Sequence, residues 1–385
     1  MKKIISYKNP DLITIKDNKA LWNLPKTRRH GYRNLHKINR YGLFLRSDLI
    51  LKLKKNNKSK IYNKPLVKKM INNKSFCSLI VGNRQKILFE RYAKDFPKNQ
   101  PQTIMSITKM FINLFVGELV KNKSINLNKK VSYYLPKIGT GYASAKIQDV
   151  LNMNIINAYS EDYTKAYSSS FLHEPVGGWR LPANKDAHLS QENFLNTIKS
   201  NKNRSLKNKT DLALYKSANT DVIGLIIEKA SGKSLRHWML RAVEAAGFED
   251  GLYIASDRYG MPWMSGGGCL ITRDFLRMGL LFARKGKGVG NRKIGSPSFL
   301  DHTINNLGPK YMNLSKDKYL HYSNSTMVSG NMIGHSGYGG QFLAINLKTG
   351  NVAAFFSVLE TKSATKESYK VDMINMLIDL VNDKY

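Results

Sequence analysis

Ser106 and Lys109 stand three residues apart in the segment IMSITKMFINLFVGELV, residues 104–120. Residues at this spacing lie on the same face of a helix, so the hydroxyl and the amine would be neighbours. Serine is a weak nucleophile at its free pKa and needs a nearby group that takes its proton. The segment is apolar on nearly all sides, which predicts a helix buried inside the protein. We interpret the pair as a candidate nucleophile and base.

Two further polar motifs follow at a distance along the chain. YKSANTD, residues 215–221, directly precedes the apolar run VIGLIIEKASG, and GHSGYGG, residues 334–340, precedes the strand-like FLAINL. The order Ser-x-x-Lys, Tyr-x-Ser and His-x-Gly resembles the three-motif pattern of the serine β-lactamase and penicillin-binding superfamily. The chain most resembles the class C-like branch that contains esterases and 6-aminohexanoate-dimer hydrolase. The likeness extends over residues 75–360.

The resemblance implies a serine hydrolase that forms an acyl-enzyme on Ser106, with no metal and no organic cofactor. Lys109 and Tyr215 are both candidates for the base, since a buried ammonium and a nearby phenol have coupled pKa values. The residues alone leave that choice open. By resemblance we favour Tyr215 as the proton relay to the leaving group, with Lys109 keeping the Tyr215 hydroxyl polarised. The oxyanion would lie between the backbone N–H groups of Ser106 and Tyr338.

The motifs depart from those of β-lactamases and cell-wall peptidases in two places. His335 and Gly337 stand where those enzymes carry Lys-Thr-Gly, and Ser217 stands where they usually carry asparagine. An imidazole is a poorer permanent partner for a substrate carboxylate than lysine is. We therefore expect Ser217, His335, Gly337 and Tyr338 to form a site for carboxylic esters or small linear amides. His335 would line this pocket and orient its neighbours without taking the Ser106 proton.

Tyr163, in the loop AYSEDYTKAYSSS, either closes over a bound substrate or belongs to an ordinary surface loop rich in tyrosine and serine. Two other functions remain as alternatives. One is a β-lactamase or D,D-peptidase of the same fold. The other is a non-catalytic protein that binds a polyanion through its basic surface.

Hydrophobic patterns predict the elements that would position these motifs. Residues 76–82 and 87–93 are predicted to form one β-hairpin, and residues 341–347 and 352–358 another. The final stretch, residues 366–384, has apolar residues at helical spacing. It is predicted to be a helix that packs on the sheet built from these strands.

The resemblance implies the serine β-lactamase/penicillin-binding-protein fold, an α/β (α+β) architecture with an antiparallel sheet flanked by helices. A mainly helical lobe would be inserted into it. We expect one hydrolase module over residues 1–385, a length that can bury a large core. Residues 1–103 and 262–385 would form the sheet-containing lobe and residues 104–261 the helical lobe. The active site would lie in the cleft between them.

The chain is strongly basic, with 62 Lys and Arg against 27 Asp and Glu and a net charge of +35. Such an excess is typical of proteins that bind nucleic acids or anionic surfaces. The lysines, however, are spread among asparagine and isoleucine residues over the whole chain, and no zinc-finger or helix-turn-helix pattern accompanies them. We expect a compositional bias, a small-molecule ester or amide substrate, and no specific nucleic-acid partner.

The remaining sequence signals concern metals, redox state and location. The two cysteines, Cys77 and Cys269, lack C-x-x-C spacing, and we expect both to be buried thiols. The eight histidines include no His-x-x-x-His pair that would favour a metal site. No apolar stretch has the length of an export signal or of a membrane span, so we expect a cytoplasmic protein without membrane contact.

Overall fold

The computed structural model describes residues 5, 21–163, 165, 167–180, 190–201 and 205–385. The other residues fall within the expected lobes 1–103 and 104–261, and two of them within the loop of Tyr163. They lie outside the described residues.

A nine-stranded sheet forms the centre of the fold, in the order β2-β4-β3-β13-β12-β11-β10-β9-β8. All neighbouring strands are antiparallel except β2 and β4. The predicted hairpins are confirmed as β3–β4 and β12–β13, each within a residue or two of the expected bounds. The strands are β2 (Lys54–Lys55), β3 (Phe76–Asn83), β4 (Lys86–Tyr92), β8 (Lys310–Ser315), β9 (Lys318–Ser323), β10 (Thr326–Ser329), β11 (Met332–Gly337), β12 (Gln341–Asn346) and β13 (Asn351–Ser357).

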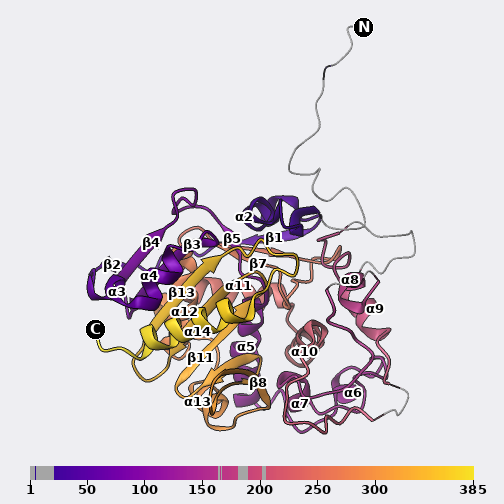
Figure 1. The fold of residues 1–385 in the computed structure, drawn as a ribbon. Coiled ribbons are helices and arrows are strands. Elements are labelled where there is room, and N and C mark those ends of the chain that lie inside the picture. Colours follow the sequence, from indigo (N-terminus) through magenta and orange to yellow (C-terminus); the bar gives the residue numbers. More distant parts are fainter. Residues whose placement is uncertain (1–4, 6–20, 164, 166, 181–189, 202–204) are drawn as a thin grey trace.

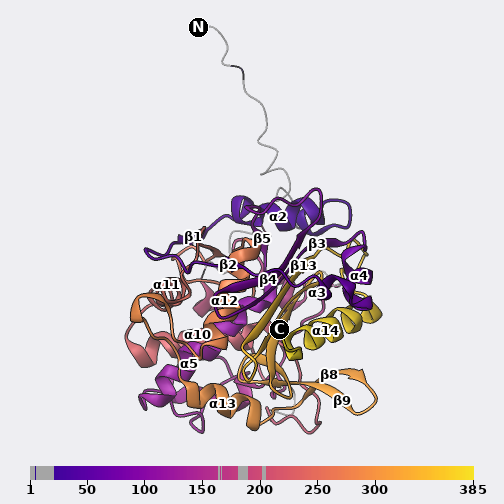
Figure 2. The same ribbon diagram turned by 90° about the vertical axis from the view of Figure 1, so that its left-hand side faces the viewer.

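Helices cover the sheet on both faces, and Figure 2 shows α12 (Thr272–Ala283) and α14 (Glu367–Asn382) on opposite sides of it. Successive residues of a strand point to opposite faces. Val352 and Ala354 of β13 accordingly belong to the core shared with α12, whereas Ala353 and Phe355 belong to the core beneath α14. The predicted C-terminal helix is thus confirmed. Burial on both faces explains why β12 and β13 are apolar without alternation.

A second, four-stranded sheet in the order β1-β6-β7-β5 was not predicted. Its strands are β1 (Gly42–Leu45), β5 (Gln102–Thr103), β6 (Leu252–Ala255) and β7 (Gly268–Leu270). They are too short to show a period in the sequence, and β6 lies inside the range expected to be mainly helical. This small sheet matters for function because β5 leads directly into the segment that carries Ser106 (Figure 1).

The described chain between β5 and β6 is mainly helical. Its central helix, α5 (Met110–Lys121), is buried along most of its length, as its apolar sequence predicted. The other helices of this part are η2 (Met105–Lys109), α6 (Val131–Tyr134), α7 (Ile147–Leu151), α8 (Ser169–His173), α9 (Gln191–Asn196), α10 (Ser217–Ser231) and α11 (Leu235–Ala246). Elsewhere the chain forms η1 (Leu21–Asn23), α2 (Arg28–Ile38), α3 (Lys60–Asn63), α4 (Pro65–Ile71), η3 (Val289–Asn291) and α13 (Pro297–Asn305).

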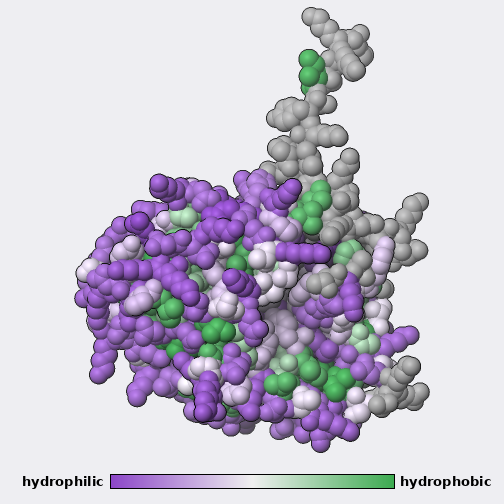
Figure 3. Space-filling view, viewed as in Figure 1, coloured by the Kyte–Doolittle hydropathy of each residue, from purple (hydrophilic) through white to green (hydrophobic). Residues whose placement is uncertain are grey.

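The thiols of Cys77 and Cys269 are free and buried, as predicted. None of the helices in the described part of the chain combines the length and apolar character that crossing a membrane requires. The face in Figure 3 is largely hydrophilic, with hydrophobic residues scattered among the charged ones.

Candidate active site

The backbone around Ser106 is held in an unusual conformation. Met105, directly before the serine, has a φ of +49°, in the left-handed region that non-glycine residues seldom adopt. Such a residue costs about 1–3 kcal/mol and persists where its surroundings fix it. Here the Met105 N–H donates to Thr103 Oγ1 at 3.2 Å, and Thr108 Oγ1 donates to the Met105 carbonyl at 2.7 Å. The small sheet and η2 therefore present Ser106 in one fixed direction.

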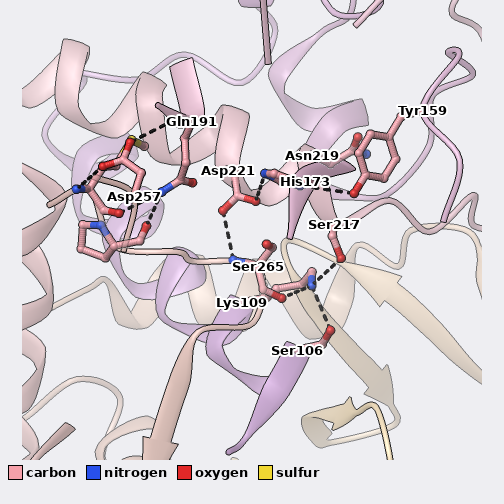
Figure 4. A network of polar contacts seen from close by, with 12 residues as sticks. Ser106, Lys109, Tyr159, His173, Gln191, Ser217, Asn219, Asp221, Asp257 and Ser265 are labelled. Carbon is pink, nitrogen blue, oxygen red and sulfur yellow. Dashed lines mark hydrogen bonds and ion pairs between the residues drawn. The ribbon is translucent and has the colours of Figure 1, made fainter. Parts of the chain in front are cut away.

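Lys109 is fully buried and meets the serine, so the structure brings the predicted pair together. Its Nζ lies 3.0 Å from Ser106 Oγ and 3.3 Å from Ser217 Oγ, and also donates to the Ser265 carbonyl. Figure 4 shows these three contacts converging on the amine. Burial disfavours the charged form and lowers the pKa of Lys109 to about 8, although the carboxylates of Glu161 and Asp221 oppose the shift. A minor fraction of the amine is thus neutral at pH 7, and this fraction rises as the pH approaches the pKa.

A carboxylate that the sequence did not single out completes this side of the site. Glu161 accepts the Ser217 N–H through Oε2 at 2.8 Å and the Ser217 hydroxyl through Oε1 at 2.6 Å. The Tyr163 hydroxyl also donates to Oε1. Ser217 is the first residue of α10, where a negative charge is favoured by the helix dipole. In the sequence Glu161 is one acid in a polar loop, so no pattern distinguished it.

Tyr215 lies beside Lys109 but presents its ring rather than its hydroxyl. The Lys109 Nζ is 5.1 Å from the centre of the ring. Tyr311 and Tyr322 pack around it at centroid distances of 5.7 and 5.8 Å. The buried hydroxyl has no hydrogen-bond partner among the described residues. Burial raises the pKa of Tyr215 well above its ordinary value, which disfavours a phenolate in this resting arrangement.

His335, on β11, is fully buried, and its ring lines neither of the two cavities beside Ser106. This differs from the expectation that it faces the pocket. Side chains alternate along a strand, and the neighbouring Ser336 takes the cavity-facing position. His335 Nδ1 lies 2.7 Å from the Ser336 carbonyl, so Nδ1 carries the proton and Nε2 accepts from the Tyr322 hydroxyl at 3.0 Å. Burial lowers the pKa of His335 to about 3, and the ring is neutral.

Ser106 lies where two cavities meet. Tyr163 and Tyr338 stand at this junction with ring centroids 5.2 Å apart, and line both cavities. The larger cavity, of about 150 Å³, is lined by Ser106, Tyr163, Tyr215, Tyr311, residues 336–340, Leu359, Ala364, Thr365, Tyr369, Lys370 and Met373. The smaller, of about 40 Å³, is lined by Trp22, Asn23, Met105, Ser106, Tyr159, Tyr163, Ser170, Glu174, Trp179, Ser217, Trp263, Ser265, Gly266 and Tyr338. A substrate bound across both cavities would place its middle at the serine.

Gly337 has a steric reason to be glycine. A Cβ at this position would lie 2.6 Å from the Ile104 carbonyl oxygen, so the end of β11 packs directly against the chain that precedes Ser106. The close approach brings Tyr338 and Ser106 to one cavity wall. The sequence identified Gly337 and Tyr338 from the third motif, and the structure supplies the packing that joins this motif to the first, which contains Ser106.

Behind Lys109 lies a second buried carboxylate. Asp221 of α10 accepts the Ser265 N–H at 3.0 Å, and its other oxygen is 3.7 Å from His173 Nε2. Burial raises the pKa of Asp221 to about 7 and lowers that of His173 to about 3. Asp221 thus steadies the Ser265 backbone whose carbonyl holds Lys109. Within the described ranges, no three His, Cys, Asp or Glu side chains come together as metal ligands do.

Comparisons with known proteins identify the family and the fold. Residues 77–372 match the model of the Beta-lactamase family. Over 222 residues the chain is 27% identical to a 6-aminohexanoate-dimer hydrolase of Paenarthrobacter ureafaciens, a match that covers 56% of this chain and 54% of the relative, about half its length. The fold is similar to that of a Bacillus anthracis protein described as a candidate 6-aminohexanoate-dimer hydrolase, with a TM-score of 0.77, 18% identity and 98% of each chain covered. A family VIII carboxylesterase matches with a TM-score of 0.60 and 12% identity, over 83% of this chain and 97% of its own.

Proposed function

The chain belongs to the Beta-lactamase family, and from that premise we propose that it cleaves carboxylic esters or small linear amides through an acyl-enzyme on Ser106. It is a hydrolase of the serine β-lactamase fold, related to 6-aminohexanoate-dimer hydrolase. One observation carries the proposal. A lysine amine whose pKa is lowered to about 8 lies 3.0 Å from a serine hydroxyl at the junction of two cavities.

Lys109 is the base in this mechanism. Its neutral amine takes the proton of Ser106 as Oγ attacks the carbonyl carbon, and Lys109 becomes an ammonium. Tyr215 is less suited to this step, because its pKa is raised and its hydroxyl makes no hydrogen bond with a described residue. Tyr215 instead donates its hydroxyl proton to the leaving group and recovers one from the Lys109 ammonium. Its place in the wall of the larger cavity supports that role.

The oxyanion of the tetrahedral intermediate is held by the backbone N–H groups of Ser106 and Tyr338. The N–H groups of the first turn of a helix lack partners within that helix, which leaves the Ser106 amide free for this contact. Tyr338 directly follows the last residue of β11. The tight packing of Gly337 against residue 104 supports a rigid arrangement of the two amides. Water then attacks the acyl-enzyme, with Lys109 again taking the proton.

The third motif favours linear esters and amides over penicillins. The third motif contributes a neutral, buried imidazole in place of the lysine of β-lactamases, so it offers a substrate carboxylate no permanent charge. The larger cavity has several tyrosine rings in its wall, which suits the apolar part of a linear substrate. The relative's name and the carboxylesterase of the same fold point to these two substrate classes.

The test is covalent labelling followed by turnover. The protein is incubated with a fluorophosphonate and its intact mass measured, then assayed with p-nitrophenyl esters, aminohexanoate oligomers and nitrocefin. We expect one adduct, located on Ser106, and hydrolysis of the esters or oligomers. Labelling of another residue, or faster turnover of nitrocefin than of every ester and oligomer, contradicts the proposal.

A further inference from the structure

We propose that Glu161 is a positioning residue for proton transfer, which acts through Ser217 to direct the lone pair of Lys109 at Ser106. Glu161 lines neither of the two cavities beside the serine, so it does not contact the reacting atoms. The inference rests on the proposed function, because it assigns a role within that mechanism.

The argument begins with the direction of the hydrogen bonds at Ser217. A carboxylate only accepts hydrogen bonds. Glu161 therefore takes both protons that Ser217 can give, the amide proton at 2.8 Å and the hydroxyl proton at 2.6 Å. The Ser217 hydroxyl oxygen, 3.3 Å from Lys109 Nζ, can then act toward the lysine only as an acceptor.

The same reasoning determines the contacts of Lys109. The Ser265 carbonyl also only accepts, so two of the three polar neighbours of Nζ require an N–H from the lysine. A neutral amine has two N–H groups and one lone pair. With both N–H groups directed at Ser217 and Ser265, the lone pair is left to face Ser106, 3.0 Å away. The hydrogen bonds that Glu161 accepts therefore fix the direction of proton transfer, from the Ser106 hydroxyl to the Lys109 amine.

Glu161 is itself held in place. The Tyr163 hydroxyl donates to the same carboxylate oxygen as the Ser217 hydroxyl, and Lys216 donates to the carbonyl of Tyr159, which anchors the loop next to α10. The carboxylate thus receives three hydrogen bonds from two elements. This arrangement exists before substrate binds.

Glu161→Gln tests the direction of these bonds. A glutamine oxygen must stay on the Ser217 N–H, which leaves the amide nitrogen facing the Ser217 hydroxyl as a donor. The hydroxyl proton then turns toward Lys109 and occupies the lone pair that Ser106 needs. General base catalysis is worth about 10²–10⁴ in rate, so we expect the maximal rate constant of fluorophosphonate labelling to fall about 10- to 100-fold. The reagent concentration at half-maximal rate should change less than about 2-fold.

Glu161→Ala gives an independent reading. It removes the acceptor without adding a donor, so the Ser217 hydroxyl remains free to accept from Lys109. We expect Glu161→Ala to label faster than Glu161→Gln. If Glu161 served only to pack the loop, Glu161→Ala, the larger truncation, would label more slowly than Glu161→Gln. That order of labelling rates overturns the inference.

Ser217→Ala completes a double-mutant cycle. With no hydroxyl at position 217, Glu161→Gln has nothing to reorient, so the double variant should label as fast as Ser217→Ala alone within about 2-fold. If the losses in labelling rate of the two single variants multiply in the double variant, the inference is overturned. Asp162→Asn is the matched control, because it removes a charge from the same loop where the carboxylate pairs with Lys165. It should label at the wild-type rate. Failure of the wild type to label on Ser106 would refute the proposed function, and the inference with it.

Discussion

The amine of Lys109 and the hydroxyl of Tyr215, on the two sides of Ser106, differ in how completely they are partnered. On the Lys109 side, the amine contacts Ser106, Ser217 and Ser265, and Glu161 satisfies Ser217 in turn. On the Tyr215 side, the hydroxyl is buried without a partner among the described residues. An unsatisfied buried polar group costs about 1–3 kcal/mol, so an unpartnered hydroxyl at a proposed active site asks for an explanation.

The difference separates the two proton transfers of the proposed mechanism. The acceptor of the Ser106 proton is arranged before substrate arrives, since all its partners belong to the protein. The donor to the leaving group has no partner until a substrate supplies the atom that will take the proton. Each prediction below changes one side and asks whether the other side responds.

The largest effect is expected at the nucleophile that the two sides share. Ser106→Ala should abolish both labelling and turnover, while the free energy of unfolding changes little because one oxygen is removed. Intact-mass spectrometry and urea denaturation measure the two quantities. Ester hydrolysis above the uncatalysed rate in this variant would assign the nucleophile elsewhere.

Lys109→Met keeps most of the side-chain volume and removes the amine. We expect kcat to fall at least about 100-fold for every substrate, because the general base is lost. Removing one buried charge also removes its desolvation penalty, so the melting temperature should stay the same or rise. A variant that retains activity but melts early would make Lys109 a structural residue.

Tyr215→Phe should discriminate between leaving groups. An alkyl amide expels a strongly basic nitrogen and needs a proton, so kcat should fall about 100-fold. A p-nitrophenyl ester expels a stable anion, so its acylation rate should fall much less. Equal losses on both substrates would transfer the role of base to Tyr215 and reverse the assignment of the two sides. In either case the effects of Lys109→Met and Tyr215→Phe should combine far from additively on the amide.

Sequence patterns were enough to predict the part of the Lys109 side that one contiguous motif builds. The spacing of Ser106 and Lys109 places them on one helical face, and burial of α5 follows from its apolar residues. Glu161 could not be recognised, because a single loop acid looks like a solvated one until its distance to Ser217 is known. The strands of the small sheet that fixes Met105 are too short to show a period in the sequence. The orientation of His335 depends on which face of β11 meets the cavity, and that is set by packing against chain distant in sequence, such as the segment at Ile104.

The pH dependence reports on the Lys109 side. With a pKa of about 8, only a minor fraction of Lys109 is neutral at pH 7. Raising the pH removes its proton and creates the active base, so kcat/KM for a neutral ester should rise about tenfold between pH 7 and pH 9. Tyr215→Phe should retain this rise. A flat profile for the wild type over this range would argue against a titrating lysine.

The smallest effect is expected at His335, which supports the Tyr215 side from behind. Its Nε2 accepts from Tyr322, whose ring packs against Tyr215, and the imidazole itself lies with its ring centroid 6.2 Å from that of Tyr215. Glutamine can offer a carbonyl oxygen to the same hydroxyl. The change disturbs one neutral hydrogen bond worth about 1 kcal/mol, and His335→Gln should lower kcat about 5-fold or less. Amide and p-nitrophenyl ester kinetics on this variant measure the effect, with the melting temperature as the control for folding. If a folded His335→Gln protein lost as much activity as Ser106→Ala, the imidazole would take part in the chemical step. The role assigned to Tyr215 would then have to be revised.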